Sequence, residues 1–340
     1  MAGIDEVAAL AGVSTATVSR ALSGKSKVSE ATRDRVIRVA DSLGYVVSAS
    51  ASSLASGRTR NIGVVIPYLE RWYFTTVLEG AASALLESGY DLTLYNLSGG
   101  DDKRRTVFEH FILRKRVDAV IAIALELGPS ELGRLLELKK PLVGVGGPLP
   151  GVRTLSIDDV AVGRLATEHL ISLGHRSIGL VGSSPENETD FHVPTNRRAG
   201  FEGALEAVGL PVDPELYQSS DFTIEGGYRA AKQLLGNPRK RPTAIVAVSD
   251  EMAFGAMLAA RDLGLQVPDD LSVVGIDDHR LSDFYGLTTV AQHPFDQGRL
   301  AVKILMDQLH PSSAVLGSEN IELPFELLVR SSTSRPQYLR

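Results

Sequence analysis

The sequence has no cysteine among its 340 residues. This absence excludes thiolate nucleophiles, cysteine-ligated zinc and iron–sulfur clusters, and it suits a reducing compartment. The sequence also has no run of about 18 apolar residues, so no segment is expected to span a membrane. Residues 1–10 contain Asp5 and Glu6 and lack the basic start and apolar run of a secretory signal. We therefore expect a cytoplasmic protein.

The sequence is rich in apolar residues, and its charges are unevenly distributed. Hydrophobic residues make up 44% of the chain and charged residues 22%, which is typical of a folded globular protein with more than one domain. The net charge is −6, yet residues 1–60 carry eight Lys and Arg against five Asp and Glu. That N-terminal part therefore has a net charge of +3 and the remainder −9, which favours a polyanionic partner for the N-terminal part.

The first 45 residues have the spacing of three short helices, predicted over 4–11, 15–22 and 30–43. Ser14 and Ser29 stand where they can cap the second and third helices. The first two helices are joined by the small residues of an Ala-Gly-Val-Ser turn, which allow close crossing. This pattern predicts a helix-turn-helix. The following low-complexity stretch, residues 48–57, is expected to be a linker or a segment that folds on binding.

From Asn61 onward, short Val- and Ile-rich runs alternate with amphipathic helices. Continuous apolar strands alternating with helices predict parallel sheets covered on both faces. About 280 residues are too many for one such sheet, so we expect two α/β lobes with a ligand cleft at the carboxyl ends of their strands. The strands are predicted over 62–66, 92–95, 119–124, 142–145, 178–181, 244–248 and 272–276, and helices over 75–88, 163–173, 196–208, 226–235, 251–263 and 296–309.

The run IDEVAALAGVSTATVSRALSGKSKVSEATRDRVIRVADSLGY resembles the DNA-binding head of the LacI/GalR family of transcriptional regulators. Later segments match further motifs of the family in order: ASGRTRNIGVVIP, RRAGFEGAL, AVSDEMAFGAM, LSVVGIDD, LTTVAQ and LPFELLVR. The resemblance covers nearly the whole chain. It implies a small all-α helix-turn-helix head (1–46), a hinge (47–60) and a two-lobed α/β effector domain like periplasmic binding proteins (61–340). The implied lobe limits are about 61–157 with 291–321, and about 158–290 with 322–340.

The resemblance implies a homodimeric repressor that binds a pseudo-palindromic operator beside carbohydrate-utilisation genes and is released by a sugar or related metabolite. It gives base-reading roles to Thr15, Ala16 and Arg20. Arg20 can grip guanine through two hydrogen bonds, whereas Ala16 offers only apolar contact. For Ser14, Thr17 and Ser29, helix capping and surface polarity remain an alternative. Phosphate contacts are implied for Ser14, Thr17, Ser19, Ser29, Thr32 and Tyr45.

Leu54 is the one large apolar residue of the hinge stretch. The resemblance implies that two hinge helices of a dimer lie in the minor groove, where their leucines unstack a central base step. The alternative is that Leu54 packs against the effector domain. Residues 49–56 are too few for a stable isolated helix, so we expect them to become helical only on operator DNA.

An effector cleft is implied at positions where strands end or helices begin. Carboxylates and Arg bind paired hydroxyls through charge-assisted hydrogen bonds, and aromatic rings cover the apolar face of a pyranose. Phe74 could equally be a core-packing residue. Trp72, beside the cleft, could equally stack on a ligand or belong to a surface patch. Asp158 and Asp159 are expected to charge a helix N-terminus. The implied effector-binding residues are Tyr73, Phe74, Arg197, Phe222, Ser249, Asp250 and Asp277.

Other chemistry finds no support in the sequence. The glycine spacing needed for a phosphate loop or a dinucleotide fingerprint is incomplete, and no G-x-S-x-G elbow occurs. The seven histidines are scattered without metal-ligand spacing, and His175 is expected to be structural. No cofactor or metal is expected, and the chain is not expected to be an enzyme. Three alternatives stay open: a solute-binding protein, an enzyme of sugar metabolism, and a regulator whose ligand tightens DNA binding.

Overall fold

A computed structural model of the chain describes residues 3–22, 28–45, 57–98, 101–111, 116–183, 191–310 and 320–337. These residues form two compact units, one of Met1–Asn61 with Arg116–Asp118 and one of Ile62–Lys115 with Ala119–Arg340. No helix among the described residues is both long enough and apolar enough to cross a membrane.

The described residues of the first unit form three helices, α1 (Ile4–Ala11), α2 (Thr15–Leu22) and α3 (Glu30–Ser42). Their apolar faces meet in a small core that includes Val7, Val18 and Val36, all fully buried. Gly12 ends α1 with a φ of +65°, a left-handed conformation that glycine adopts without a steric penalty. The predicted helices are therefore confirmed, α3 ending one residue earlier than expected. Leu54 and residues 47–56 of the expected hinge lie outside the described residues.

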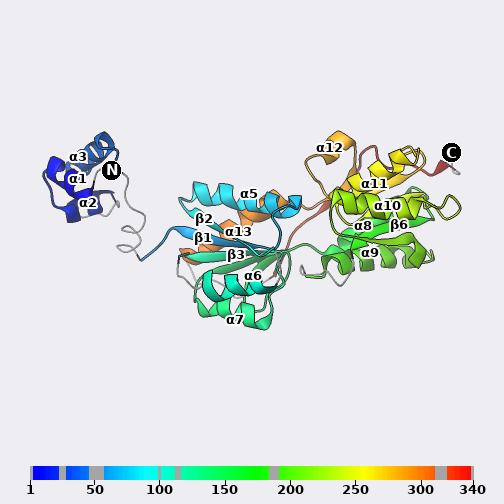
Figure 1. Ribbon diagram of the computed structural model, residues 1–340, viewed down its shortest axis with the longest axis horizontal. Coiled ribbons are helices and arrows are strands. Elements are labelled where there is room, and N and C mark those ends of the chain that lie inside the picture. The colour runs from blue at the N-terminus through cyan, green and yellow to red at the C-terminus, as the bar shows by residue number, and fades with distance from the viewer. Residues whose placement is uncertain are drawn as a thin grey trace. The chain divides into compact units, whose positions relative to one another are not determined.

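The second unit is built on two six-stranded sheets, each of which forms a lobe with its helices (Figure 1). In the first lobe the strand order is β11-β5-β4-β3-β1-β2, and in the second it is β12-β10-β9-β8-β6-β7. The pairs β1–β3, β3–β4, β4–β5, β5–β11, β7–β6, β6–β8, β8–β9 and β9–β10 are parallel, and β12 runs antiparallel to β10. The strands are β1 (Asn61–Ile66), β2 (Asp91–Asn96), β3 (Ala119–Ile123), β4 (Leu142–Val145), β5 (Arg153–Ser156), β6 (Ile178–Ser183), β7 (Tyr217–Ser220), β8 (Ala244–Ala247), β9 (Ser272–Asp277), β10 (Thr288–Ala291), β11 (Asn320–Glu322) and β12 (Glu326–Leu328).

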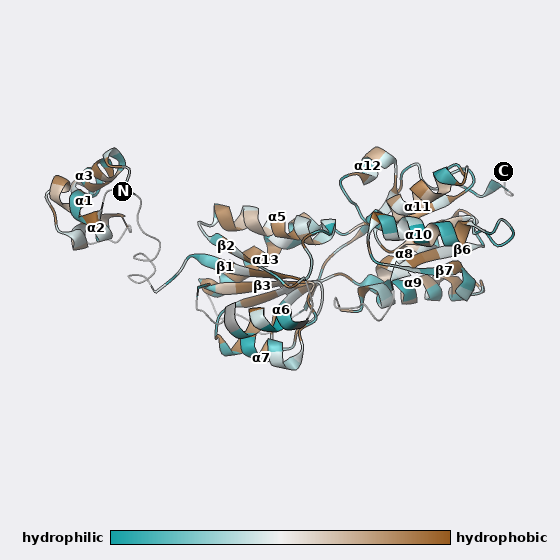
Figure 2. Cartoon of the chain, in the orientation of Figure 1, coloured by the Kyte–Doolittle hydropathy of each residue, from teal (hydrophilic) through white to brown (hydrophobic). Residues whose placement is uncertain are grey.

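Helices cover both faces of each sheet, and the central strands are the most hydrophobic part of each lobe (Figure 2). The chain crosses between the lobes after β5, after β10 and after β11. The predicted fold class, a helix-turn-helix head with a two-lobed parallel α/β domain, is confirmed; the lobe limits stay a prediction. The helices are α5 (Trp72–Glu87), α6 (Asp101–Thr106) with a π-helical turn (Val107–Phe111), α7 (Pro129–Glu137), α8 (Asp159–Ser172), α9 (Val193–Ala207), α10 (Ile224–Leu235), α11 (Asp250–Asp262), α12 (Ser282–Tyr285) and α13 (Pro294–Leu309).

Helices α8 and α9 approach each other closely through two glycines. A Cβ atom on Gly163 of α8 would lie 2.1 Å from the carbonyl oxygen of Arg197, and one on Gly200 of α9 would lie 2.0 Å from that of Val160. Both distances are impossible for real side chains, so any larger residue would force the two helices apart. The glycines therefore fix the position of Arg197 relative to the start of α8.

Candidate functional site

The exposed face of α2 carries polar and small side chains. Val18 and Ala21 are buried in the core of the first unit, while Thr15, Ala16, Ser19 and Arg20 are exposed. The structure therefore brings the three expected base-reading residues, Thr15, Ala16 and Arg20, onto one accessible helix surface. Such a surface fits the major groove of DNA, which admits an α-helix.

The expected phosphate-contacting residues frame α2 and α3. Ser14 Oγ accepts a 3.2 Å hydrogen bond from the Thr17 backbone N–H and lies 2.9 Å from Thr17 Oγ1. Ser29 caps α3 in the same way, through a 3.4 Å hydrogen bond from the Thr32 backbone N–H. Tyr45 packs its ring against the core of the unit. Capping and phosphate contact are compatible roles, because an exposed hydroxyl retains further hydrogen-bonding capacity.

A pocket lies between the two lobes of the second unit. It opens at the carboxyl ends of parallel strands, because Ala124 follows β3, Gly146 follows β4 and Ser249 follows β8. This is the position at which α/β sheets bind ligands. The described residues that line it are Arg71, Tyr73, Phe74, Ala124, Gly146, Ile157, Asp159, Val193, Arg197, Phe222, Ser249, Glu251, Asp277, Gln292 and Gln297.

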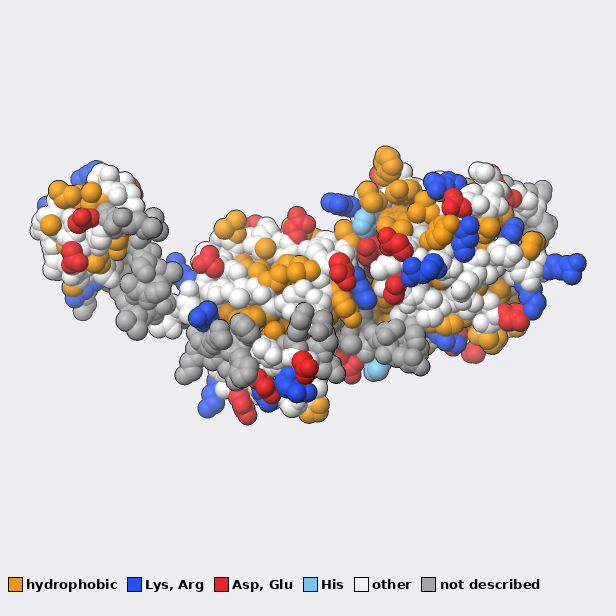
Figure 3. Space-filling view, viewed as in Figure 1, with side chains coloured by type: hydrophobic (Ala, Val, Ile, Leu, Met, Phe, Trp, Pro, Cys, Tyr) orange, Lys and Arg blue, Asp and Glu red, His pale blue; other side chains and the backbone are white. Residues whose placement is uncertain are grey.

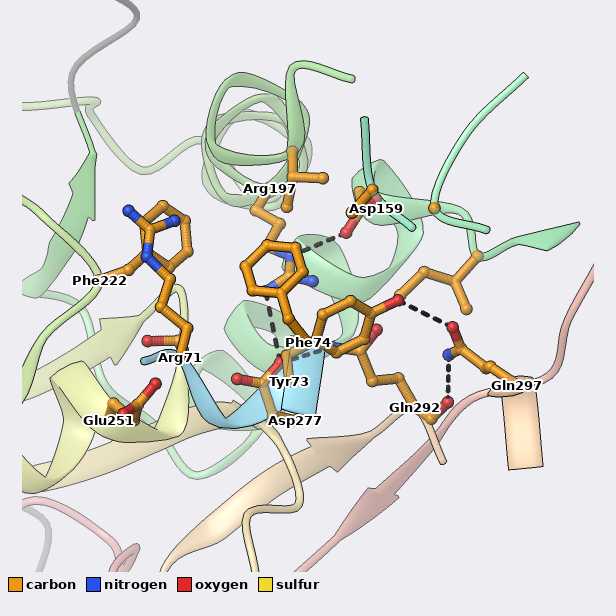
Figure 4. A pocket seen from close by; sticks show the side chains of 15 residues that line it. Arg71, Tyr73, Phe74, Asp159, Arg197, Phe222, Glu251, Asp277, Gln292 and Gln297 are labelled. Atoms are coloured by element: carbon orange, nitrogen blue, oxygen red, sulfur yellow. Dashed lines mark hydrogen bonds and ion pairs between the residues drawn. The ribbon is translucent and has the colours of Figure 1, made fainter. Parts of the chain in front are cut away.

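Arg197 forms the polar centre of the pocket (Figure 4). Its Nε donates a 2.8 Å hydrogen bond to Asp159 Oδ1, and its Nη1 donates a 2.6 Å hydrogen bond to the carbonyl oxygen of Val248. Nη1 also lies 3.8 Å from Asp277 Oδ1. Burial disfavours the charge of Arg197, but the carboxylates of Asp159 and Asp277 raise its pKa above the ordinary value. The guanidinium is therefore a permanent donor.

The two acids beside Arg197 have raised pKa values. Burial raises the pKa of Asp159, and it raises the pKa of Asp277 well above the usual range, more than the neighbouring Arg197 lowers either. Asp277 Oδ1 accepts a 2.5 Å hydrogen bond from Gln292 Nε2. Both carboxyls can therefore form hydrogen bonds with hydroxyl groups of a ligand.

Three aromatic side chains, Tyr73, Phe74 and Phe222, line the pocket. Tyr73 and Phe74 stand in the first turn of α5 with their ring centroids 5.5 Å apart. Tyr73 Oη donates a 2.8 Å hydrogen bond to Gln297 Oε1, and Gln297 Nε2 donates to the carbonyl oxygen of Gln292. Phe74 belongs to the core of the first lobe and also lines the pocket, so its expected core packing is confirmed and its contact with an effector stays a prediction.

Three residues that line this pocket have strained backbone conformations. Phe222 has a φ of +61°, Asp277 of +131° and Ala124 of +43°, conformations that L-residues rarely adopt. Strained residues of this kind cluster at ligand sites, where the surrounding structure holds them in place.

The structure brings six of the seven expected effector residues to the pocket and places Asp250 elsewhere. Asp250 is fully buried, and its Oδ2 accepts hydrogen bonds from the His279 backbone N–H at 2.8 Å and from Ser282 Oγ at 2.6 Å. Its Oδ1 accepts a 2.7 Å hydrogen bond from Thr289 Oγ1. Burial raises the pKa of Asp250 to about 6. These contacts orient Asp250 away from the lining, toward the segment that follows Asp277.

Several pocket residues were not predicted from the sequence. Asp159 was expected only to charge a helix N-terminus, a role that Asp158 fills by capping α8 through a 2.9 Å bond from the Ala161 N–H. Arg71, Glu251 and Gln297 lacked any local signal. Gln292 directly follows β10, so recognising that short strand would have pointed to it. Among the described residues, no group of three or more His, Asp or Glu side chains is placed to hold a metal ion.

Comparison with known proteins gives consistent results over the whole chain. Residues 3–48 match the family described as bacterial regulatory proteins, lacI family, and residues 167–333 match the periplasmic binding protein-like domain. The HTH-type transcriptional repressor PurR of Haemophilus influenzae (strain PittEE) is 34% identical over 337 residues, 98% of each chain. The repressor CytR of Escherichia coli is 33% identical over 336 residues, 98% of this chain and 96% of CytR.

Solved structures resemble the chain over nearly the same length. The lac repressor dimer bound to operator and the anti-inducer ONPF has a TM-score of 0.85 at 28% identity, covering 98% of this chain and 99% of that one. The transcriptional regulator CelR in complex with cellobiose has a TM-score of 0.71 at 30% identity, covering 98% of this chain and 100% of that one.

Proposed function

The chain belongs to the lacI family of bacterial regulatory proteins and is a DNA-binding transcriptional regulator, and we propose that it represses carbohydrate-utilisation genes until a sugar or related metabolite releases it. The observation that carries the proposal is the buried Arg197 flanked by Asp159 and Asp277 in a pocket with aromatic walls. The proposed setting is the cytoplasm. CelR is similar to this chain and was solved with cellobiose, and a lacI-family regulator of Enterococcus faecium was solved with ribose.

For the head, we propose that α2 reads bases in the major groove through Thr15, Ala16 and Arg20. The exposure of these residues supports this role. Ser14, Thr17, Ser19, Ser29, Thr32 and Tyr45 are proposed to contact phosphates, which fixes the position of α2 on the duplex. Leu54 is proposed to insert between base pairs in the minor groove at the operator centre.

For the pocket, we propose that Arg197 and Asp277 bind adjacent hydroxyls of the effector. Arg197 donates hydrogen bonds, and a carboxylate accepts them, so the pair suits a ring with neighbouring hydroxyl groups. Tyr73, Phe74 and Phe222 are proposed to pack on the apolar face of that ring. Ser249 lines the pocket and adds a hydroxyl, although its Oγ already accepts a 3.3 Å bond from the Met252 N–H. Asp250 is proposed to support these residues indirectly, by holding the segment that follows Asp277 through His279 and Ser282.

For assembly, we propose a homodimer that uses the apolar surface of α12. Phe284 is 85% exposed, Tyr285 47% and Leu281 38%. These side chains form part of an apolar patch visible at the top of the second lobe (Figure 3). Exposed clusters of this kind mark association surfaces, and a symmetric dimer matches the two half-sites of a palindromic operator.

The test is operator binding and release. Duplexes with a random palindromic core would be selected on the immobilised full-length protein, and the selected duplex compared with a scrambled one in a mobility-shift assay. We expect tighter binding of the selected duplex by at least about 1,000-fold. Sugars, nucleosides and purine bases would then be added singly.

The outcomes separate the alternatives. Release by a sugar supports the proposed logic, whereas tighter binding with any ligand shows a co-repressor. Equal affinity for selected and scrambled duplexes would contradict the function and favour a solute-binding protein. Turnover of an added sugar would instead favour an enzyme.

A further inference from the structure

Two adjacent residues of the first lobe, Arg71 and Trp72, contact the second lobe at the edge of the pocket. The Arg71 guanidinium carbon lies 4.0 Å from the ring centroid of Tyr68 in its own lobe and 5.2 Å from that of Phe222 in the other lobe. Figure 4 shows the Arg71 and Phe222 side chains next to each other at the edge of the pocket. Its Nη2 also lies 3.5 Å from the carbonyl oxygen of Asp221, which it faces as a donor. Arg71 thus bridges one aromatic ring from each lobe.

Trp72 makes the second contact between the lobes. Its indole lies 4.7 Å from the imidazole of His279, which follows β9 in the second lobe. His279 is held firmly, because its backbone N–H donates to Asp250 and its Nδ1 accepts a 3.0 Å hydrogen bond from the Leu281 N–H. Burial lowers the pKa of His279 to about 4, so the ring that meets Trp72 at neutral pH is uncharged. An uncharged ring packs on indole without the large cost of burying a charge.

A further pair of contacts also joins the two lobes. Phe191 of the second lobe packs against Gly147 of the first, where a Cβ atom would lie 2.2 Å from the Phe191 ring. His192 Nε2 lies 3.8 Å from Glu126 Oε2, also across the lobes. Arg71 and Trp72 are therefore not the only residues that join the two lobes.

From this geometry we infer that Arg71 and Trp72 form a clasp that keeps the two lobes closed without any effector. None of the clasp contacts described above involves Arg197, Asp159 or Asp277. Closure therefore does not use the polar centre of the pocket, although the clasp shares Phe222 with the proposed effector-binding residues and Arg71 also lines the pocket. The clasp sets the resting balance between closed and open lobes, and an effector shifts that balance only by its differential affinity for the two forms. The inference goes beyond the proposed function and does not depend on it.

The test uses Trp72 itself as the reporter, because it is the chain's only tryptophan. Acrylamide quenching of its fluorescence in the full-length protein, without DNA or added ligand, reports how accessible the indole is. Removing the Arg71 guanidinium in Arg71→Ala should lower the closed-to-open ratio roughly tenfold, which lies between the effect of an exposed and of a desolvated cation–π contact and suits the half-buried Arg71. Trp72 should then be quenched more strongly than in the parent. Arg71→Lys keeps the positive charge but lacks the planar guanidinium. Quenching of Trp72 should therefore rise in this variant too.

The control is Arg164→Ala, which removes an exposed arginine from α8 outside the clasp and should leave quenching unchanged. Parent-like quenching in Arg71→Ala, with an unchanged circular dichroism spectrum, would overturn the inference. If Arg71→Ala fails to fold, Arg71→Lys decides: increased quenching supports the clasp, and parent-like quenching refutes it. Operator binding plays no part in this measurement, so its failure and that of the proposed function are distinguishable.

Discussion

Arg197 and Asp159 form a buried ion pair, with Nε and Oδ1 2.8 Å apart and side-chain exposures of 5% and 8%. The pair joins α9 to the first residue of α8, across the close contact that Gly163 and Gly200 allow. A buried cation whose partner is removed retains its full desolvation cost. The pair is therefore a structural requirement as well as a part of the pocket.

We expect Asp159→Ala to lower the free energy of unfolding by about 3 kcal/mol, because Arg197 would then keep only the more distant Asp277 as a charged partner. The matched control is Asp158→Ala, which removes the α8 cap beside it and should cost about 1 kcal/mol. Urea denaturation followed by circular dichroism measures both. If both variants lower the free energy of unfolding equally, the buried ion pair contributes no more to stability than the helix cap.

Asp277→Ala should abolish the response to effector while leaving operator binding without effector nearly intact. The reason is linkage: a ligand that no longer distinguishes the two states cannot shift the equilibrium between them. The measurement is the mobility-shift assay with the compound that releases the parent protein.

The control for Asp277 is the neighbouring Asp278, whose Oδ1 accepts a 2.8 Å hydrogen bond from Arg330 Nη2. Asp278→Ala should keep the response to effector. A misfolded Asp277→Ala protein, seen by circular dichroism, would show that Asp277 is structural and would remove it from the proposed site.

Arg20→Ala should weaken operator binding by roughly 1–3 kcal/mol and relax the preference at one position of each half-site. Arg20 is exposed on the same face of α2 as Ala16, which is where a base contact requires it. Binding to operators with every base substituted at each half-site position measures this effect. Equal weakening on operator and random DNA would make Arg20 a phosphate contact. Arg38→Ala, an exposed arginine of α3, should not change the base preference.

The fold was largely predictable because the long buried strands are continuous apolar runs. The strands that were missed, β5, β7, β10, β11 and β12, are only three or four residues long. In β10 the two threonines are fully buried, and one of them serves Asp250 as a hydrogen-bond donor. Polar residues that are buried for such reasons break the apolar pattern on which strand prediction depends.

The candidate site was less predictable, since most helix starts were placed too late. The first turn of α5 holds Tyr73 and Phe74, and α8 begins at Asp159. These N-terminal turns lack the apolar spacing of the helix body, because their side chains face a pocket. Arg71 and Gln297 were missed for another reason: their partners are distant in sequence, and only the tertiary structure brings them together.

His175 ties the C-terminal segment to the second lobe. Its Nδ1 lies 2.8 Å from Thr243 Oγ1, and its Nε2 lies 2.9 Å from the carbonyl oxygen of Ser334 and 3.1 Å from Ser272 Oγ. The side chain is buried, which confirms the expected structural role. Burial is the main reason that the pKa of His175 is lowered from its ordinary value.

This lowered pKa predicts a defined dependence of stability on pH. The neutral ring is favoured in the folded protein, so its contribution is fully present above the ordinary histidine pKa of about 6.5 and is lost as the pH falls toward the folded-state pKa. The free energy of unfolding should therefore decrease between pH 7.5 and pH 5.5, by at most about 1.4 kcal/mol per pH unit from this one group.

His175→Gln should lose that portion of the decrease, whereas His310→Gln, at an exposed position, should keep it. Comparing variants with the parent separates His175 from Asp250 and Asp277, whose raised pKa values act in the opposite direction. If His175→Gln retains the parent's full pH dependence in urea denaturation, the ring is not held neutral by the fold.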